Sequence, residues 1–259
     1  MITAYFRYLS RARDEHSLHS PFLFSLYTQV ITPRSGSRSL FAPIQALRKE
    51  LRRNRQVISV ADFGAGSKVN PSRQRTIGDI ARNSQKPARF ARLLFRFVQR
   101  FEAKTVVDLG TSLGMTTAYL AEATRPFGGQ VLTFEGCPQT AAIARHNFER
   151  LGIENVTTVV GNLDETLAPQ ISALGQLDFV FFDANHRYEP TVRYFETCLR
   201  AIHNDTVFVF DDIHLSDEME QAWAYIKAHP AVTVTVDLFW VGLVFFRKEQ
   251  PRQDFILRF

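Results

Sequence analysis

Thr105-Val-Val-Asp-Leu-Gly-Thr-Ser-Leu-Gly114 is the stretch that decides the fold, because an apolar run breaks there into a glycine turn. A helical segment follows, and then a second apolar run that ends in an acid, Val131-Leu-Thr-Phe-Glu135. A strand, a glycine turn, a helix and a strand ending in a carboxylate form the unit with which α/β folds hold adenosine-containing ligands.

The glycine spacing indicates which ligand this turn suits. A dinucleotide turn needs G-x-G-x-x-G, but here the glycines are Gly110 and Gly114, and Ser112 stands in the middle position. Asp108, at the strand end, would repel a pyrophosphate but suits the cationic sulfonium and amino group of S-adenosylmethionine. Glu135 is placed to accept hydrogen bonds from both ribose hydroxyls.

This segment resembles motifs I and II of the class I S-adenosylmethionine-dependent methyltransferases. The alternative is an ordinary strand-to-helix turn without a ligand. The order of strand, turn, helix, strand and acid favours the cofactor site. The resemblance implies that the cofactor is bound by Asp108, Gly110, Thr111, Ser112, Gly114, Glu135, Gly136 and Asp183.

Length and composition bound the class of protein. With 259 residues and 45% hydrophobic content, the chain can bury one large α/β core. No apolar run approaches the roughly 18 residues of a membrane span, and the first ten residues lack the features of a signal peptide. Cys137 and Cys198 are too few for a disulfide framework, so we expect buried, reduced thiols in a cytoplasmic protein.

The chain carries a formal net charge of +5, with a pI near 9.4. Much of the excess lies at 48–55 and 89–100, where arginines alternate with leucine or phenylalanine at helical spacing. Such spacing is typical of amphipathic helices with a solvated basic face. A solvated helix face is therefore favoured over a nucleic-acid-binding surface, since no recognisable binding module accompanies the charge.

The chain changes character near residue 100. Before it we expect helices at 2–14, at 19–27 with Ser20 as cap and Pro21 as first residue, at 43–55 and within 72–101. After it, apolar runs and helical segments alternate, which predicts a parallel sheet. The expected strands are 105–109, 130–135, 156–160, 177–182 and 206–210, followed by an antiparallel pair at 232–238 and 242–247.

The predicted fold class is thus α/β: a Rossmann-like, seven-stranded, mostly parallel sheet with a C-terminal antiparallel hairpin. We expect residues 1–100 to form a helical N-terminal extension or lid, and residues 101–259 to form the cofactor-binding domain. A second glycine loop, Val60-Ala-Asp-Phe-Gly-Ala-Gly-Ser67, lacks the following helix, strand and acid. It is interpreted as a turn or a wall of the substrate pocket.

Acidic residues follow two of the predicted strands. Asp183 comes after 177–182, and the pair Asp211 and Asp212 comes after 206–210. If the strands are neighbours, the three carboxylates converge at the edge where ligands of open α/β sheets bind. Together they would need a cation, and Mg²⁺ prefers such oxygen ligands. The alternative is that Asp183 and Asp211 cap helices while Asp212 pairs with an arginine.

The spacing Asp183-x-x-His186, followed by Asp211-Asp212, resembles the Mg²⁺-dependent O-methyltransferases of macrolide sugars and, in a related form, of catechols. The resemblance implies Asp183, Asp211 and Asp212 as metal ligands and His186 as general base, so that Asp183 and His186 are the catalytic residues. His214 is a competing base. His186 is preferred because it shares the loop of Asp183.

The function expected from these residues is metal-assisted O-methylation of a small-molecule hydroxyl by an enzyme that uses S-adenosylmethionine and Mg²⁺. The alternatives are a protein or RNA methyltransferase without metal, and a non-catalytic cofactor-binding or partner-binding module. The chain also resembles a family of uncharacterised class I methyltransferases with a helical N-terminal extension, through segments that include 19–22, 62–67 and 211–214. The terminal helices and hairpin offer surfaces for a homodimer.

Overall fold

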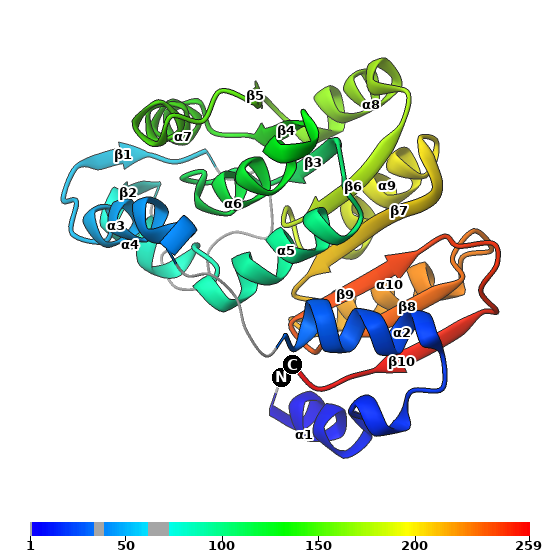
Figure 1. Ribbon diagram of the computed structural model, residues 1–259. Coiled ribbons are helices and arrows are strands. Elements are labelled where there is room, and N and C mark those ends of the chain that lie inside the picture. The colour runs from blue at the N-terminus through cyan, green and yellow to red at the C-terminus, as the bar shows by residue number, and fades with distance from the viewer. Residues whose placement is uncertain (1, 34–38, 62–72) are drawn as a thin grey trace. The chain divides into compact units, whose positions relative to one another are not determined.

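Residues 2–33, 39–61 and 73–259 are described by a computed structural model of the chain (Figure 1). They group into two compact units, each of which is described here by itself. The first unit contains Met1–Gly36 and Ile171–Phe259, and the second contains Ser37–Gln170. The second glycine loop from position 62 onward lies outside the described residues, and so do positions 34–38.

The second unit begins with helices and continues with the first three strands of the α/β pattern. Its elements are η3 Ser39–Phe41, α3 Ala42–Leu51, β1 Val57–Ser59, β2 Gln74–Thr76, α4 Ile77–Asn83, α5 Ala88–Arg100, β3 Thr105–Leu109, α6 Met115–Thr124, η4 Arg125–Phe127, β4 Gln130–Glu135, α7 Pro138–Leu151 and β5 Val156–Val160. Helix α8, Leu163–Leu174, crosses from this unit into the first.

Strands β3, β4 and β5 are parallel, and β4 lies between the other two. The strand residues of β3 and β4 are buried on both faces, and most of them are apolar, such as Val106, Val107 and Phe134. This is the composition expected of parallel strands that helices cover on both sides. In the register of β3 and β4, Leu109 lies opposite Phe134. The two strands therefore end at nearly the same height along the sheet.

Helix α5 has the amphipathic character that its sequence predicts. Leu93, Leu94, Phe97 and Val98 have no exposed surface, and the arginines of the helix lie at exposed or partly exposed positions. Burial, together with the nearby charges of Arg92 and Arg89, lowers the pKa of Arg96 to about 10.

Gly114 connects the glycine turn to α6 and has a left-handed backbone, with φ of 79°. A Cβ at this position would lie 2.6 Å from the ring of Phe148. We expect Gly114→Ala to lower the free energy of unfolding by about 2–4 kcal/mol, because backbone strain adds to overpacking. Gly152→Ala is the matched control, since Gly152 has φ of 64° and a Cβ there would meet no atom within 4 Å.

Denaturant unfolding measures both variants. Gly152→Ala should cost about 1 kcal/mol, because only the left-handed strain applies there. If both variants lost the same free energy of unfolding, the close contact with the Phe148 ring would make no contribution to the effect of Gly114→Ala.

The first unit combines the N-terminal helices with the last part of the chain. Its elements are α1 Ile2–Arg11, η1 Glu15–Ser17, α2 Pro21–Leu26, η2 Tyr27–Ile31, β6 Leu177–Phe182, α9 Tyr188–Leu199, β7 Ile202–Asp211, α10 Asp217–Ala228, β8 Val234–Asp237, β9 Val241–Phe245 and β10 Gln253–Ile256. Ser20 caps α2 and Pro21 is its first residue, as predicted.

Strand pairing in this unit follows the order β6, β7, β9, β8, β10. β6 and β7 are parallel, and β9 runs antiparallel to both β7 and β8. The predicted C-terminal antiparallel hairpin is therefore confirmed. β10, which lies parallel to β8, is an additional strand that the sequence did not predict.

The N-terminal helices pack against these C-terminal strands (Figure 1). The Tyr8 hydroxyl donates to the carbonyl of Leu257 at 2.6 Å, and the amide of Arg13 donates to the carbonyl of Ile256 at 2.9 Å. The rings of Phe22 and Phe245 meet edge to face at 5.3 Å. Residues 2–33 thus contact β9, β10 and the residue after β10, while the predicted domain boundary near residue 100 stays a prediction.

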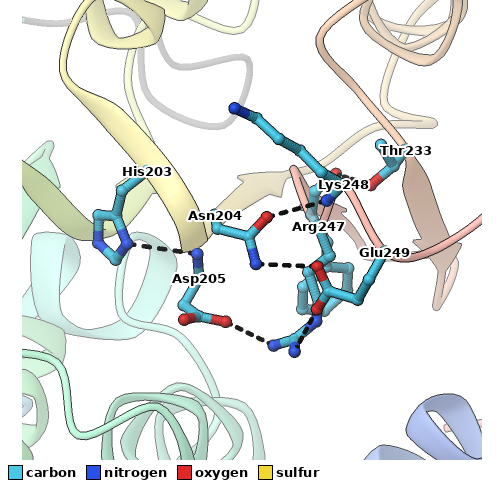
Figure 2. A network of polar contacts seen from close by, with 8 residues as sticks. His203, Asn204, Asp205, Thr233, Arg247, Lys248 and Glu249 are labelled. Carbon is cyan, nitrogen blue, oxygen red and sulfur yellow. Dashed lines mark hydrogen bonds and ion pairs between the residues drawn. The ribbon is translucent and has the colours of Figure 1, made fainter.

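A polar network joins the start of β7 to the chain after β9 (Figure 2). Arg247 contacts Asp205 at 2.6 Å and Glu249 at 2.5 Å. Asn204 donates to Glu249 and accepts from the amide of Lys248. The Arg247 guanidinium also lies 4.9 Å from the ring centroid of Phe22. The network therefore links α2 to the strand ends away from Asp211.

Both cysteines are buried free thiols, as predicted. Within the described ranges, no helix combines the length and the apolar character that crossing a membrane requires.

Candidate functional site

The glycine turn of the second unit follows β3 directly. Gly110, Ser112 and Gly114 all have positive φ, of 113°, 49° and 79°. The amides of Gly110 and Thr111 both donate to the carbonyl of Phe134 on the neighbouring strand. The turn is therefore tied to the end of β4, and its two glycines supply backbone conformations that other residues rarely adopt.

Glu135, the last residue of β4, connects the turn to the next helix. Its Oε2 accepts from the amide of Ser112 at 2.8 Å, and its Oε1 accepts from the amide of Cys137 at 2.9 Å. These two bonds fix the carboxylate plane. A carboxylate oriented in this way suits hydroxyl donors of a ligand, because each carboxylate oxygen accepts more than one hydrogen bond.

Asp108 lies beneath the turn and has no exposed surface. Its Oδ2 accepts from the hydroxyls of Thr117 at 2.6 Å and Thr133 at 2.9 Å. Because Thr133 uses its only hydroxyl proton for Asp108, the Thr111 hydroxyl must donate across the 2.6 Å contact to Thr133. A chain of buried hydroxyls therefore runs from the turn to Asp108. Direct contact of Asp108 with a cofactor stays a prediction.

Removing one hydroxyl from this chain tests its contribution. We expect Thr133→Val to lower the free energy of unfolding by about 1–3 kcal/mol, because Asp108 loses a donor and Thr111 loses its acceptor in a buried site. Thr157→Val is the control, since Thr157 is exposed on β5. Chemical denaturation measures the free energy of unfolding of both variants. Equal losses in Thr133→Val and Thr157→Val would contradict the expectation.

The carboxyl ends of β6 and β7 carry the acidic residues of the first unit. Phe182 of β6 pairs with Phe210 of the parallel strand β7. Asp183 and Asp211 directly follow these two paired residues. Asp183, His186 and Asp211 each offer a ligand atom, and these atoms all lie within 4.8 Å of one another. Asp211 is buried, and the other two side chains are partly exposed.

The loop after Asp183 turns back sharply. Asn185 and His186 both have positive φ, of 70° and 43°, and the amide of His186 donates to the carbonyl of Ala184. This turn leaves the His186 Nε2 atom 3.5 Å from Oδ1 of Asp183. The sequence spacing Asp-x-x-His thus brings the two side chains together.

Asp212 has a different position. Its backbone is left-handed, with φ of 53°, and its amide donates to the carbonyl of Trp240 at 2.7 Å. Of the predicted ligands, the grouping found among the described residues contains Asp183 and Asp211, and it contains His186 in place of Asp212. Ligation by Asp212 stays a prediction.

Helix capping does not account for these acids. Ser216 caps α10 and accepts from the amide of Met219. Arg187 precedes α9 without a capping side-chain bond, and the first amide of α9, that of Tyr188, donates to Glu218. Neither Asp183 nor Asp211 is the cap of the helix that follows it.

His214, the competing base, is held between two carboxylates. Its Nε2 lies 2.8 Å from Asp237, and its Nδ1 lies 3.1 Å from Glu220. Burial lowers the pKa of His214, but the hydrogen bonds and charges of Asp237 and Glu220 outweigh burial and raise the pKa above its ordinary value. With both ring nitrogens engaged, His214 is a structural link between β8 and α10 and does not suit the role of base.

The raised pKa predicts a pH-dependent contribution to stability. It is fully present below the unfolded-state pKa of about 6.5 and is lost as pH rises through the higher folded-state pKa. The melting-temperature deficit of His214→Gln should therefore be largest at about pH 6 and shrink toward about pH 9. His146→Gln is the control, because the His146 side chain is 67% exposed. A deficit that stays constant with pH would contradict the assignment.

Sequence reasoning missed Thr117 and Thr133. The signal available in the sequence was a threonine inside an apolar run, as in Val131-Leu-Thr-Phe134. Such a hydroxyl needs a partner, but the sequence does not say which residue provides it.

Comparison with known proteins adds family information to this geometry. Residues 107–213 match a family model described as a methyltransferase domain. A catechol O-methyltransferase of Niastella koreensis is 30% identical over 132 residues, which cover 50% of this chain and 57% of that protein. The chain spans about half the length of the curated relatives that it matches.

Solved structures extend the similarity to most of the chain. The structure described as cofactor-bound Rv0187 from MTB has a TM-score of 0.60 at 22% identity, and the match covers 88% of this chain and 95% of that one. An O-methyltransferase from Bacillus cereus in complex with SAH has a TM-score of 0.54 at 24% identity, covering 62% of this chain and 82% of that one. The chain therefore has the class I methyltransferase fold, and its residues 107–213 are similar to a methyltransferase domain.

Proposed function

We propose that this chain is an S-adenosylmethionine-dependent methyltransferase that methylates a hydroxyl group of a small molecule with the help of a divalent metal ion. The observation that carries the proposal is the convergence of Asp183, His186 and Asp211 at the ends of β6 and β7. The curated relative named above is a catechol O-methyltransferase, and the Bacillus cereus structure contains SAH. Both support a hydroxyl acceptor and this cofactor.

The proposed cofactor site consists of the glycine turn and Glu135. The Glu135 carboxylate is already oriented by two backbone amides, so it accepts the ribose hydroxyls without rearrangement. Gly110 and Gly114 supply the positive φ angles that the turn requires. Binding to a preorganised site costs less conformational entropy than binding to a mobile loop.

The proposed metal site consists of donors whose chemistry fits a divalent ion. Donor atoms around such an ion lie about 3 Å apart when adjacent and about 4.2 Å apart when opposite, given bonds of about 2.1 Å. The ligand atoms of Asp183, His186 and Asp211, all within 4.8 Å of one another, need only small side-chain rotations to reach these separations. A bound divalent ion lowers the pKa of an acceptor hydroxyl and fixes its position.

The methyl transfer forms one bond and breaks one bond. The acceptor oxygen forms a bond to the methyl carbon while the bond from that carbon to the sulfonium sulfur breaks, so S-adenosylhomocysteine leaves as a neutral thioether. The hydroxyl proton passes to a base or to solvent. Little covalent chemistry is required of the protein, and placing the methyl carbon in line with the oxygen supplies much of the rate.

Methyl-labelled S-adenosylmethionine tests the proposal. The full chain is incubated with catechols, other phenols and sugar alcohols, and in parallel with protein and RNA acceptors, with a divalent ion or with a chelator, and products are identified by mass spectrometry. We expect a methyl ether product, with its yield reduced by the chelator. Label that appears on protein or RNA and is unaffected by the chelator would overturn the proposal in favour of a metal-independent macromolecular methyltransferase.

A further inference from the structure

We propose that His186 is a ligand of the metal ion, rather than the base expected from the sequence, and that the site selects a first-row transition metal ion such as Mn²⁺ or Co²⁺ over Mg²⁺. This inference rests on the metal site of the proposed function and specifies its ligands. It assigns His186, Asp183 and Asp211 as the protein ligands.

The first support is the position of the His186 ring. Nε2 lies 3.5 Å from Oδ1 of Asp183, which is too long for a good hydrogen bond between them. The same ring offers a ligand atom within 4.8 Å of a carboxylate oxygen of Asp211. Facing two carboxylates at once is what a third metal ligand requires, whereas a base needs to face only the acceptor hydroxyl.

The second support is the way the loop places that ring. Two consecutive residues other than glycine, Asn185 and His186, adopt left-handed conformations, which are uncommon for such residues. The His186 side chain is 21% exposed, and that of Asp183 is 15% exposed. The turn therefore directs a mostly covered imidazole toward the carboxylates.

The third support is that the neighbouring histidine is already engaged. His214 has Asp237 on one ring nitrogen and Glu220 on the other, so it offers no free nitrogen to an ion. Among the described residues, His186 is the histidine that the ligand grouping contains.

The donor set determines which ions fit. Two carboxylates and one imidazole give a mixed oxygen and nitrogen site. Mg²⁺ takes oxygen ligands and keeps much of its hydration, while imidazole suits later first-row ions, whose affinity rises from Mn²⁺ through Co²⁺. An imidazole bound through Nε2 cannot also receive a proton at that atom, so proton removal from the acceptor falls to another base or to solvent.

The test uses the full chain without a histidine tag, after chelator treatment. Mn²⁺ is added, and pulsed electron paramagnetic resonance measures coupling between the ion and nitrogen-14. We expect imidazole nitrogen coupling in the wild type and in His146→Gln, and no such coupling in His186→Gln. His146 is a suitable control because its side chain is 67% exposed.

Calorimetry provides the second measurement. We expect His186→Gln to weaken Co²⁺ binding by at least about tenfold and Mg²⁺ binding by less than about threefold, because removal of the imidazole costs most for ions that favour nitrogen. Bound Mn²⁺ without nitrogen coupling, or equal losses for Co²⁺ and Mg²⁺, would overturn this inference and leave the metal site standing. Failure of the wild type to bind Mn²⁺, Co²⁺ or Mg²⁺ would overturn the metal site itself.

Discussion

Glu135→Gln is expected to weaken binding of S-adenosylmethionine by about 10- to 100-fold, which corresponds to the loss of charge-assisted hydrogen bonds of about 1.5–3 kcal/mol. The carboxylate accepts from the amides of Ser112 and Cys137. A glutamine presents an NH₂ group to one of these amides, and two donors then face each other. The exchange therefore disturbs the turn and also removes the charge that receives the ribose hydroxyls.

Isothermal titration calorimetry with S-adenosylhomocysteine measures this effect. Glu149→Gln makes the same exchange on α7, where the side chain is 77% exposed, and should leave the affinity unchanged. Circular dichroism confirms that both variants are folded. Equal affinities in wild type and Glu135→Gln would show that Glu135 does not contact the cofactor.

Asp211→Asn is expected to weaken divalent metal binding by about 100-fold or more, because a direct ligand contributes at least as much as the outer-shell partners whose loss costs 10- to 100-fold. Asp211 is 2% exposed and lies within reach of the ligand atoms of Asp183 and His186. An asparagine preserves the shape of the side chain and removes its negative charge, so the fold should tolerate the change.

Titration of Mn²⁺ followed by electron paramagnetic resonance gives the affinity directly. Asp217→Asn is the control, since Asp217 is exposed on α10. An unchanged Mn²⁺ affinity in Asp211→Asn, or an equal loss in Asp217→Asn, would exclude the site at the ends of β6 and β7.

The strands could be predicted because their sequences are dense in apolar, β-branched and aromatic residues. All seven predicted strands are present, and the alternation with helices correctly indicated parallel pairing. β10 was missed because its four residues, Gln253–Ile256, follow a proline and are mostly polar or partly exposed. Its pairing with β8 is tertiary, and a short polar segment carries little signal of its own.

In the candidate sites, the sequence could predict mainly the residues that lie at or directly after the ends of predicted strands. Asp183 and Asp211 were found because the carboxyl ends of parallel neighbours meet at one edge. The grouping of His186 with both acids depends on two left-handed residues in the loop, which sequence spacing does not specify. The place of Asp212, whose amide bonds to Trp240, depends likewise on a turn that forms only in the folded sheet.

The sequence also could not predict which elements the N-terminal segment packs against. Helices form within 2–14 and 19–27, as predicted, but the partners of this segment are β9 and the last residues of the chain, contacted through Tyr8, Arg13 and Phe22. An amphipathic helix shows that it has a buried face without showing what covers that face. Contacts at such sequence separations are set by the tertiary structure.

Calorimetric titration of S-adenosylmethionine into the chain is the most direct test of the proposed cofactor site. We expect saturable binding at one site per chain in wild type, and binding weakened by about 10- to 100-fold in Glu135→Gln. Absence of saturable binding to the wild type, or binding that Glu135→Gln leaves unchanged, would show that the glycine turn and Glu135 do not form the cofactor site.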